Sequence, residues 1–132
     1  MLFRSAVPDT LRNLPRLRYL NVSENRLTRL PLVTSLIELR ATDNQIAALP
    51  EEIGALAQLR ELHLRNNALT TLPEEIGRLQ SLRQIDLRGN PLATLPASLL
   101  ELPRLEKVDI RWVQIDDDVL DRLEARGCVV YR

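Results

Sequence analysis

The feature that most constrains how this chain can fold is a leucine-and-asparagine frame that recurs along most of its length. The frame places aliphatic residues (an alanine in one case) eight, five and three positions before an asparagine. The asparagines that end its copies are Asn25, Asn44, Asn67 and Asn90. They are spaced by 19, 23 and 23 residues, and a fifth copy keeps the frame but ends in Val113. Repetition at such a period is typical of a solenoid, in which each repeat forms one rung of a stack and buries its leucines against its neighbours.

Each rung is expected to begin with a short strand, because leucines that alternate with polar residues bury one face of an extended segment. The asparagine amide can hydrogen-bond the backbone of adjacent turns and so form a ladder across the rungs. A Leu-Pro pair follows each of the first four frames, at residues 30–31, 49–50, 72–73 and 95–96. Proline and glycine allow the returning chain only a short helix or a 3₁₀ turn.

The stretches 49–54 and 72–77, both Leu-Pro-Glu-Glu-Ile-Gly, resemble the 23-residue class of the leucine-rich-repeat family. The shorter copy, residues 30–39, resembles the 20-residue repeats of bacterial ubiquitin-ligase effectors. The resemblance covers nearly the whole chain. It implies an α/β right-handed solenoid with a curved parallel sheet on its concave face and short helices or 3₁₀ turns on its convex face. It also implies a protein-binding scaffold, often intracellular and in several cases bacterial.

We expect a single domain over residues 1–132, with five repeats in residues 17–115. Residues 1–16 are interpreted as an N-terminal half-repeat or cap: either residues 2–14 form a small capping helix, or the chain is a piece of a longer array. Residues 116–132 are expected to form a capping helix, with acids at its start and Gly127 at its end, and a last strand. Counting 23 residues on from Leu105 reaches Cys128, so that Cys128 and Tyr131 take the places of two leucines in that strand.

Charge and cysteine content limit the classes of partner. The 18 basic and 18 acidic residues balance, which argues against binding nucleic acid or an anionic membrane through bulk charge. No apolar run approaches the roughly 20 residues of a membrane span. Cys128 is the only cysteine, which excludes an internal disulfide and fits a reducing compartment. The apolar stretch at the N-terminus is too short for a secretory signal, because polar residues begin at Arg4. The expected location is therefore the cytoplasm, or a host cytoplasm if the protein is a delivered effector.

The positions between the buried ones of each frame are expected to line the concave face in ladders about 4.8 Å apart. The third positions are Tyr19, Glu38, Glu61, Gln84 and Lys107, and the fifth are Asn21, Arg40, His63, Asp86 and Asp109. The seventh positions are Ser23, Thr42, Arg65, Arg88 and Arg111. From these ladders and their rim we select as candidate partner-binding residues Tyr19, Arg40, His63, Arg65, Asp86, Arg88, Asp109, Arg111 and Trp112.

The arginine row Arg65, Arg88 and Arg111 has two interpretations. It can clamp the carboxylates of a partner, since guanidinium binds them in bidentate fashion. It can equally be a solvated ladder neutralised by Asp86 and Asp109, each exposed pair being worth about 0–1 kcal/mol.

Tyr19 and Trp112 are the candidate aromatic anchors of a binding surface. For Trp112 the favoured interpretation is packing under the C-terminal cap, because large aromatic side chains are usually mostly buried. Tyr19 has the better claim to exposure.

The sequence offers little for chemistry. His63 is the only histidine, and a hydrolytic or metal site needs further ligands or a nucleophile within reach. Cys128 is interpreted as a core residue. We therefore expect no catalytic, cofactor or metal site, and a module that binds a protein partner on its concave face.

The alternative function is a substrate-binding or regulatory part of a larger kinase, GTPase or ubiquitin-ligase polypeptide. The oligomeric state is expected to be a monomer or a weak homodimer formed through the N-terminal edge of the sheet, near Leu20 and Val22.

Overall fold

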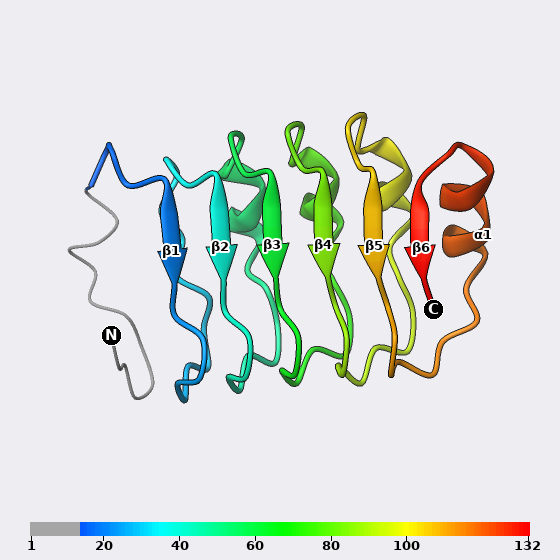
Figure 1. Ribbon diagram of the computed structural model, residues 1–132, viewed down its shortest axis with the longest axis horizontal. Helices are drawn as coiled ribbons and strands as arrows, with labels where there is room; N and C mark the ends of the chain where they lie inside the picture. Colours follow the sequence, from blue (N-terminus) through cyan, green and yellow to red (C-terminus); the bar gives the residue numbers. More distant parts are fainter. Residues whose placement is uncertain (1–13) are drawn as a thin grey trace.

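The computed structural model describes residues 14–132, and the predicted capping helix at residues 2–14 lies almost entirely outside this range. The described strands form one parallel sheet whose order is the order of the sequence, from β1 to β6 (Figure 1). Their bounds are β1 Tyr19–Asn21, β2 Glu38–Arg40, β3 Glu61–His63, β4 Gln84–Asp86, β5 Lys107–Asp109 and β6 Val129–Tyr131. The sheet is open, so the predicted repeat solenoid is confirmed.

Within residues 14–132, three 3₁₀ helices and one α-helix lie behind the sheet (Figure 1). They are η2 Glu51–Ala55, η3 Glu74–Arg78, η4 Ala97–Glu101 and α1 Asp118–Ala125. Each 3₁₀ helix is preceded by a proline whose own backbone is extended. The predicted short helix or 3₁₀ turn after each Leu-Pro pair is thus confirmed for these three rungs. The aliphatic core fills the space between the sheet and these helices.

The asparagines of the frame form the predicted ladder. The Asn67 side-chain oxygen accepts a hydrogen bond from the Ile46 amide at 3.1 Å. Its amide nitrogen donates to the carbonyls of Ala41 and Leu64, both at 3.0 Å. Asn44 and Asn90 repeat this pattern one rung away on either side. Asn44, Asn67 and Asn90 therefore each tie their own rung to the one before it.

The residue before each ladder position has a left-handed backbone. Its φ is +59° at Glu24, +58° at Asp43, +56° at Asn66, +68° at Gly89 and +62° at Trp112. Asn, Asp and Gly tolerate this region, whereas a bulky side chain there is an outlier. Trp112 therefore stands at a position that suits it poorly.

Successive 3₁₀ helices approach closely at the glycines of the Leu-Pro-x-x-Ile-Gly stretches. A Cβ on Gly77 would lie 2.8 Å from both Cβ and the carbonyl oxygen of Ser98, on η4. A Cβ on Gly54 would lie 3.0 Å from Cδ of Arg78 and 3.2 Å from the Glu75 carbonyl oxygen, on η3. The absence of a side chain at Gly77 is thus required by the spacing of the rungs.

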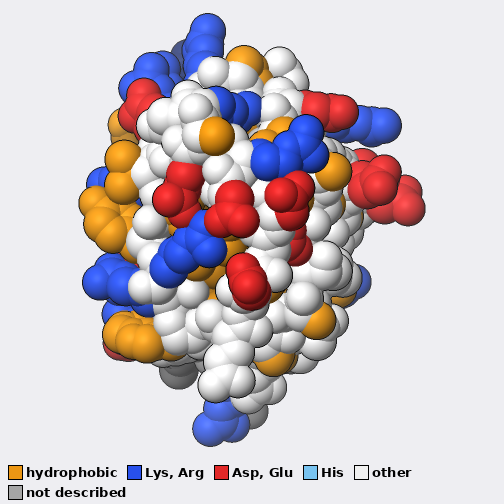
Figure 2. Space-filling view, turned by 90° about the vertical axis from the view of Figure 1, so that its right-hand side faces the viewer, with side chains coloured by type: hydrophobic (Ala, Val, Ile, Leu, Met, Phe, Trp, Pro, Cys, Tyr) orange, Lys and Arg blue, Asp and Glu red, His pale blue; other side chains and the backbone are white. Residues whose placement is uncertain are grey.

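The C-terminal end of the array is covered by α1. The Asp117 carboxylate accepts a hydrogen bond from the Val119 amide at 2.8 Å at the start of α1, and Gly127 has φ +100° just after its end. The helix buries Val119, Leu120 and Leu123 against the last rung. Figure 2 shows this end of the molecule, where acidic and basic side chains are spread over the surface.

The predicted register of the last strand is wrong by one residue. Val130 pairs with Val108, and Tyr131 pairs with Asp109. Cys128 is buried as predicted, but its amide bonds the Leu123 carbonyl at 3.0 Å directly after the helix. The 23-residue count fails here because a helix with its own end geometry replaces the usual turn. Tyr131 consequently lies on the outer face of the sheet and not in the core.

Candidate functional site: the outer face of the sheet

The side chains that point away from the core form one continuous surface, which we call the sheet face. It consists of the outward positions of β1–β6 together with the predicted seventh positions that follow the strands. The pairing of β1 through β5 aligns Glu38 with Glu61 and His63 with Asp86, and the other predicted third and fifth positions align in the same way. The sequence therefore placed these residues in correct neighbouring positions.

Two of the three arginines in the predicted row are paired with carboxylates of the same face. Arg88 binds Asp86 through Nε at 2.9 Å and an Nη at 2.6 Å, and its Nε also lies 3.3 Å from Asp109. Arg111 binds Asp109 through Nε at 3.0 Å and an Nη at 2.7 Å. The neutralised ladder is therefore the interpretation that holds for Arg88 and Arg111.

These pairs change the proton affinity of their members. Burial alone would raise the pKa of Asp109, but hydrogen bonds from Arg111 and the charges of Arg88 and Arg111 outweigh it and lower the pKa below its ordinary value. The hydrogen bonds to Asp86 are the largest cause that raises the pKa of Arg88. Both groups stay charged over the physiological pH range.

Arg65 differs from the other arginines of the sheet face. Arg40 binds Glu38 at 2.6 Å, and Arg88 and Arg111 have the partners just described. Within residues 14–132, Arg65 forms no ion pair, and its buried Nε has no hydrogen-bond partner. Its guanidinium instead lies 5.1 Å from the centroid of the Trp112 ring. Arg65 is thus a cation of this face whose charge no described carboxylate neutralises.

Trp112 is 65% exposed, so the favoured interpretation that it packs under the cap is wrong. Its left-handed backbone turns the side chain out of the core and over the sheet face, within 5.6 Å of Arg88 as well as close to Arg65. Tyr131 lies similarly near Lys107, at 5.7 Å, and Arg111, at 5.5 Å. Cations and aromatic rings alternate along this part of the face, and each contact is worth about 0.5–1 kcal/mol at exposed sites.

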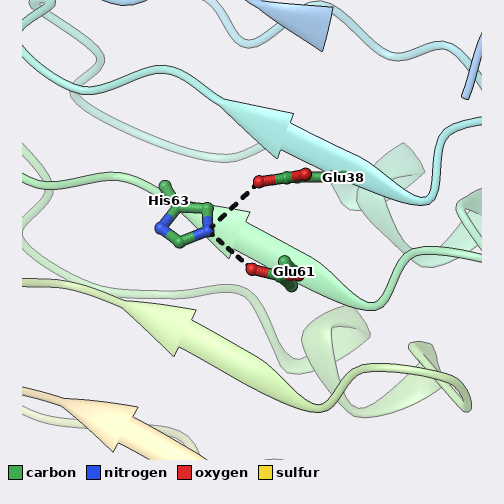
Figure 3. Close-up of side chains that lie close together, drawn as sticks. All are labelled: Glu38, Glu61 and His63. Carbon is green, nitrogen blue, oxygen red and sulfur yellow. Dashed lines mark hydrogen bonds and ion pairs between the residues drawn. The ribbon is translucent and has the colours of Figure 1, made fainter. Parts of the chain in front are cut away.

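A second group of polar side chains lies on β2 and β3, at the N-terminal side of the first group. Figure 3 shows Glu38, Glu61 and His63 turned toward one another from β2 and β3. His63 Nε2 lies 3.2 Å from Glu61 Oε1 and 3.8 Å from Glu38 Oε1. His63 therefore has two acidic neighbours that could serve as further ligands.

The nine predicted site residues thus fall into separate groups. Arg65, Asp86, Arg88, Asp109, Arg111 and Trp112 lie together, His63 and Arg40 flank Glu38, and Tyr19 stands 65% exposed on the first rung. The sequence interpretation did not select Glu38, Glu61 or Tyr131. A signal for the two glutamates was present, because equal positions in consecutive repeats are neighbours in a parallel stack. Tyr131 was missed because of the register error.

Comparison with protein-family models gives two matches. A model described as "Leucine-rich repeat region" matches residues 35–125, more than half of the chain. The chain belongs to the leucine-rich-repeat family. A second leucine-rich-repeat model matches residues 16–34, so the short repeat is recognised as well.

Solved leucine-rich-repeat structures superpose on most of the chain. A leucine-rich-repeat protein from Leptospira interrogans has a TM-score of 0.87 and 32% identity, over 96% of this chain and 34% of that one. The ectodomain of the receptor kinase GASSHO1/SCHENGEN3 from Arabidopsis thaliana, solved in complex with CASPARIAN STRIP INTEGRITY FACTOR 2, has a TM-score of 0.76 and 30% identity. It covers 90% of this chain and 16% of that one. These relatives share the repeat architecture.

The name of a mouse relative includes a second type of domain beside the leucine-rich repeat. The leucine-rich repeat and calponin homology domain-containing protein 1 of Mus musculus is 43% identical over 56 residues, which are 40% of this chain and 8% of that protein. The leucine-rich-repeat chain thus spans well under two thirds of each relative named above. Within residues 14–132, no helix has the length and apolar character that crossing a membrane requires.

Proposed function

We propose that this leucine-rich-repeat chain is a non-catalytic protein-recognition module that binds its partner on the sheet face. The observation that carries the proposal is the combination of Arg65, a cation without a described carboxylate partner, with the exposed ring of Trp112 above it. Exposed aromatic and arginine side chains are the residue types that dominate binding hot spots. Both residues directly follow strands of the sheet, β3 and β5, so little ordering cost falls on this side of the complex.

The charge pattern indicates what the partner offers. Asp86 and Asp109 already pair with Arg88 and Arg111, so the charge left to be matched beside Trp112 is that of Arg65. We propose that the partner is a protein segment that places a carboxylate on Arg65 and an apolar side chain against Trp112. This replaces the three-arginine clamp of the sequence interpretation by a single arginine and an aromatic ring.

Selection of peptides from a random library on the immobilised chain tests this proposal. The expected result is enrichment of peptides with Asp or Glu next to an aliphatic or aromatic residue. A charged hydrogen bond contributes about 1.5–3 kcal/mol, so Arg65→Ala should weaken binding of the selected peptides at least about tenfold. Arg104→Ala removes an exposed arginine that lies in the turn before β5 and is the matched control. Selected peptides without an acidic residue, or an affinity that Arg65→Ala leaves unchanged, would overturn the proposal.

A second candidate function is the binding or regulatory part of a larger enzyme such as a kinase, GTPase or ubiquitin ligase. The observation in its favour is the small share of each relative that this chain spans, 34%, 16% and 8%. The Arabidopsis relative is itself the ectodomain of a receptor kinase. Sequencing the reading frame around the gene separates the two candidates: a fused catalytic domain supports the second.

For location and assembly we propose a reducing compartment, the cytoplasm or a host cytoplasm, and a monomer or weak dimer. The buried free thiol of Cys128 suits the first proposal. For the second, β1 stands at the end of the described strand order, and an uncovered edge strand favours pairing with another copy. Fractionation of the source cell and light scattering at high concentration test the two proposals.

A further inference from the structure

We infer that the sheet face also carries a binding site for a divalent transition-metal ion such as Zn²⁺, formed by Glu38, Glu61 and His63. Each residue offers one ligand atom, and the three atoms lie within 4.8 Å of one another. The site uses none of the residues of the Arg65–Trp112 pair, although His63 and Arg65 belong to the same rung, and it does not depend on the function proposed for that pair. Metal binding here is a property of this chain alone.

The distances suit a small ion. Zn²⁺ lies about 2.0–2.2 Å from imidazole nitrogen and carboxylate oxygen, so tetrahedral ligand atoms stand roughly 3.4 Å apart. The His63–Glu61 distance of 3.2 Å is close to this value, and the His63–Glu38 distance of 3.8 Å exceeds it by a few tenths of an ångström. Rotation of a glutamate side chain closes that gap without moving a strand.

The surroundings of these side chains favour a cation. Glu38 and Glu61 are paired positions on neighbouring parallel strands, where like charges directly opposite one another are destabilising. Both carboxylates nevertheless turn toward the same imidazole (Figure 3). The side chains of Glu38, His63 and Glu61 are only 19%, 17% and 35% exposed, so water screens their charges incompletely. A divalent ion between them removes the repulsion.

The donor set selects the class of ion. An imidazole nitrogen suits Zn²⁺ and its transition-metal neighbours, whereas Mg²⁺ and Ca²⁺ prefer shells of oxygen ligands. Three protein ligands on one face leave a tetrahedral ion its fourth position open toward solvent. The opposing feature is Arg40, whose Nε donates to Glu38 Oε1 at 2.6 Å. Arg40 must release this oxygen, or Glu38 must use its other one, when the metal binds.

The test is titration of the tag-free, full-length chain with Zn²⁺ by calorimetry. The expected result is one ion per chain and an affinity for Mg²⁺ at least about a hundredfold lower. His63→Ala and Glu61→Gln should each lower the Zn²⁺ affinity at least about tenfold. Arg40→Ala should raise it, because it frees Glu38. Glu52→Gln is the matched control, since Glu52 is an exposed acid on η2, and it should leave the affinity within about twofold.

Two results would overturn the inference. The first is an affinity that neither His63→Ala nor Glu61→Gln changes, with circular dichroism showing both variants folded. The second is a Co²⁺ absorption spectrum with a thiolate charge-transfer band, which would place the ion on Cys128. Because His63 is the only histidine, a metal-induced shift of the imidazole resonances in NMR assigns the ion to this cluster without ambiguity.

Discussion

The guanidinium of Arg65 lies 5.1 Å from the centroid of the Trp112 ring, although these residues belong to rungs two apart in the stack. The contact exists because Trp112 occupies a position whose backbone is left-handed in every rung from Glu24 onward. There the chain turns the side chain away from the core. A residue type that suits the backbone poorly is thus held where a partner can reach it.

Trp112→Asn should change the free energy of unfolding by less than about 1 kcal/mol. The variant loses two cation–π contacts worth about 0.5–1 kcal/mol each but relieves the left-handed strain, since asparagine tolerates this region. Urea denaturation measures the change. A loss of about 3–5 kcal/mol, which is typical of deleting a buried aromatic ring, would contradict the exposed position. The same substitution should weaken binding of the selected peptides, because it removes the exposed ring.

Asn67→Ala should destabilise the chain by about 1–3 kcal/mol, because it leaves the buried Ile46 amide without its partner. The Ala41 and Leu64 carbonyls each lose one hydrogen bond but keep those from Asn44 and Asn90. Asn66→Gly is the matched control: it removes the preceding asparagine side chain, whose hydrogen bond to Asp43 is exposed to solvent, and keeps a residue that accepts φ +56°. Denaturation midpoints of both variants at equal slope give the comparison. Equal losses would argue that the ladder contributes nothing specific.

Gly77→Ala should cost about 1–3 kcal/mol, as overpacking usually does, and Gly54→Ala should cost less. A methyl group at Gly77 meets the Ser98 backbone at 2.8 Å, whereas the nearest atom to one at Gly54 is the flexible Arg78 side chain at 3.0 Å. Thermal unfolding of the two variants ranks them. The reverse order would mean that η3 and η4 are more easily separated than η2 and η3.

Acid should remove the stability that Asp109 contributes. Its pKa is lowered in the folded chain, so its stabilising effect is fully present above the unfolded pKa, near 4, and is lost as the pH falls below that value through the folded pKa. Asp109→Asn should therefore lower the Tm at pH 7 and reduce the further drop between pH 5 and pH 2. A variant with the wild-type pH profile would show that the Arg88 and Arg111 pairs contribute no net stability.

The period of the sequence was enough to predict the sheet, its register through β5 and the asparagine ladder, because identical frames must superpose in a stack. It was not enough where a side chain's direction depends on local backbone geometry. Trp112 lies just outside the strand, and its size alone predicted burial. Its positive φ instead directs the side chain into solvent. Tyr131 was displaced by one residue because α1 follows its own geometry at its C-terminal end.

The candidate site was predictable as a surface but not as a set of contacts. Each arginine of the row holds the same position in its repeat, yet Arg88 and Arg111 meet aspartates while Arg65 does not. The difference lies in the fifth position of the repeat, which is His63 on β3 but Asp86 on β4 and Asp109 on β5. The cluster of Glu38, Glu61 and His63 likewise depends on side-chain torsions that the repeat frame leaves free.

The close approach at Gly77 has a geometrical consequence for the whole array. The spacing between the rungs that carry η3 and η4 is limited at the back of the array by the missing side chain at Gly77. A larger residue at Gly77 would push η3 and η4 apart. The strands of these two rungs would then tilt toward each other, which shortens the distance along the sheet face between side chains such as Tyr19 and Trp112. One methyl group at the back of the array would thus change the length of ligand that fits along the sheet face.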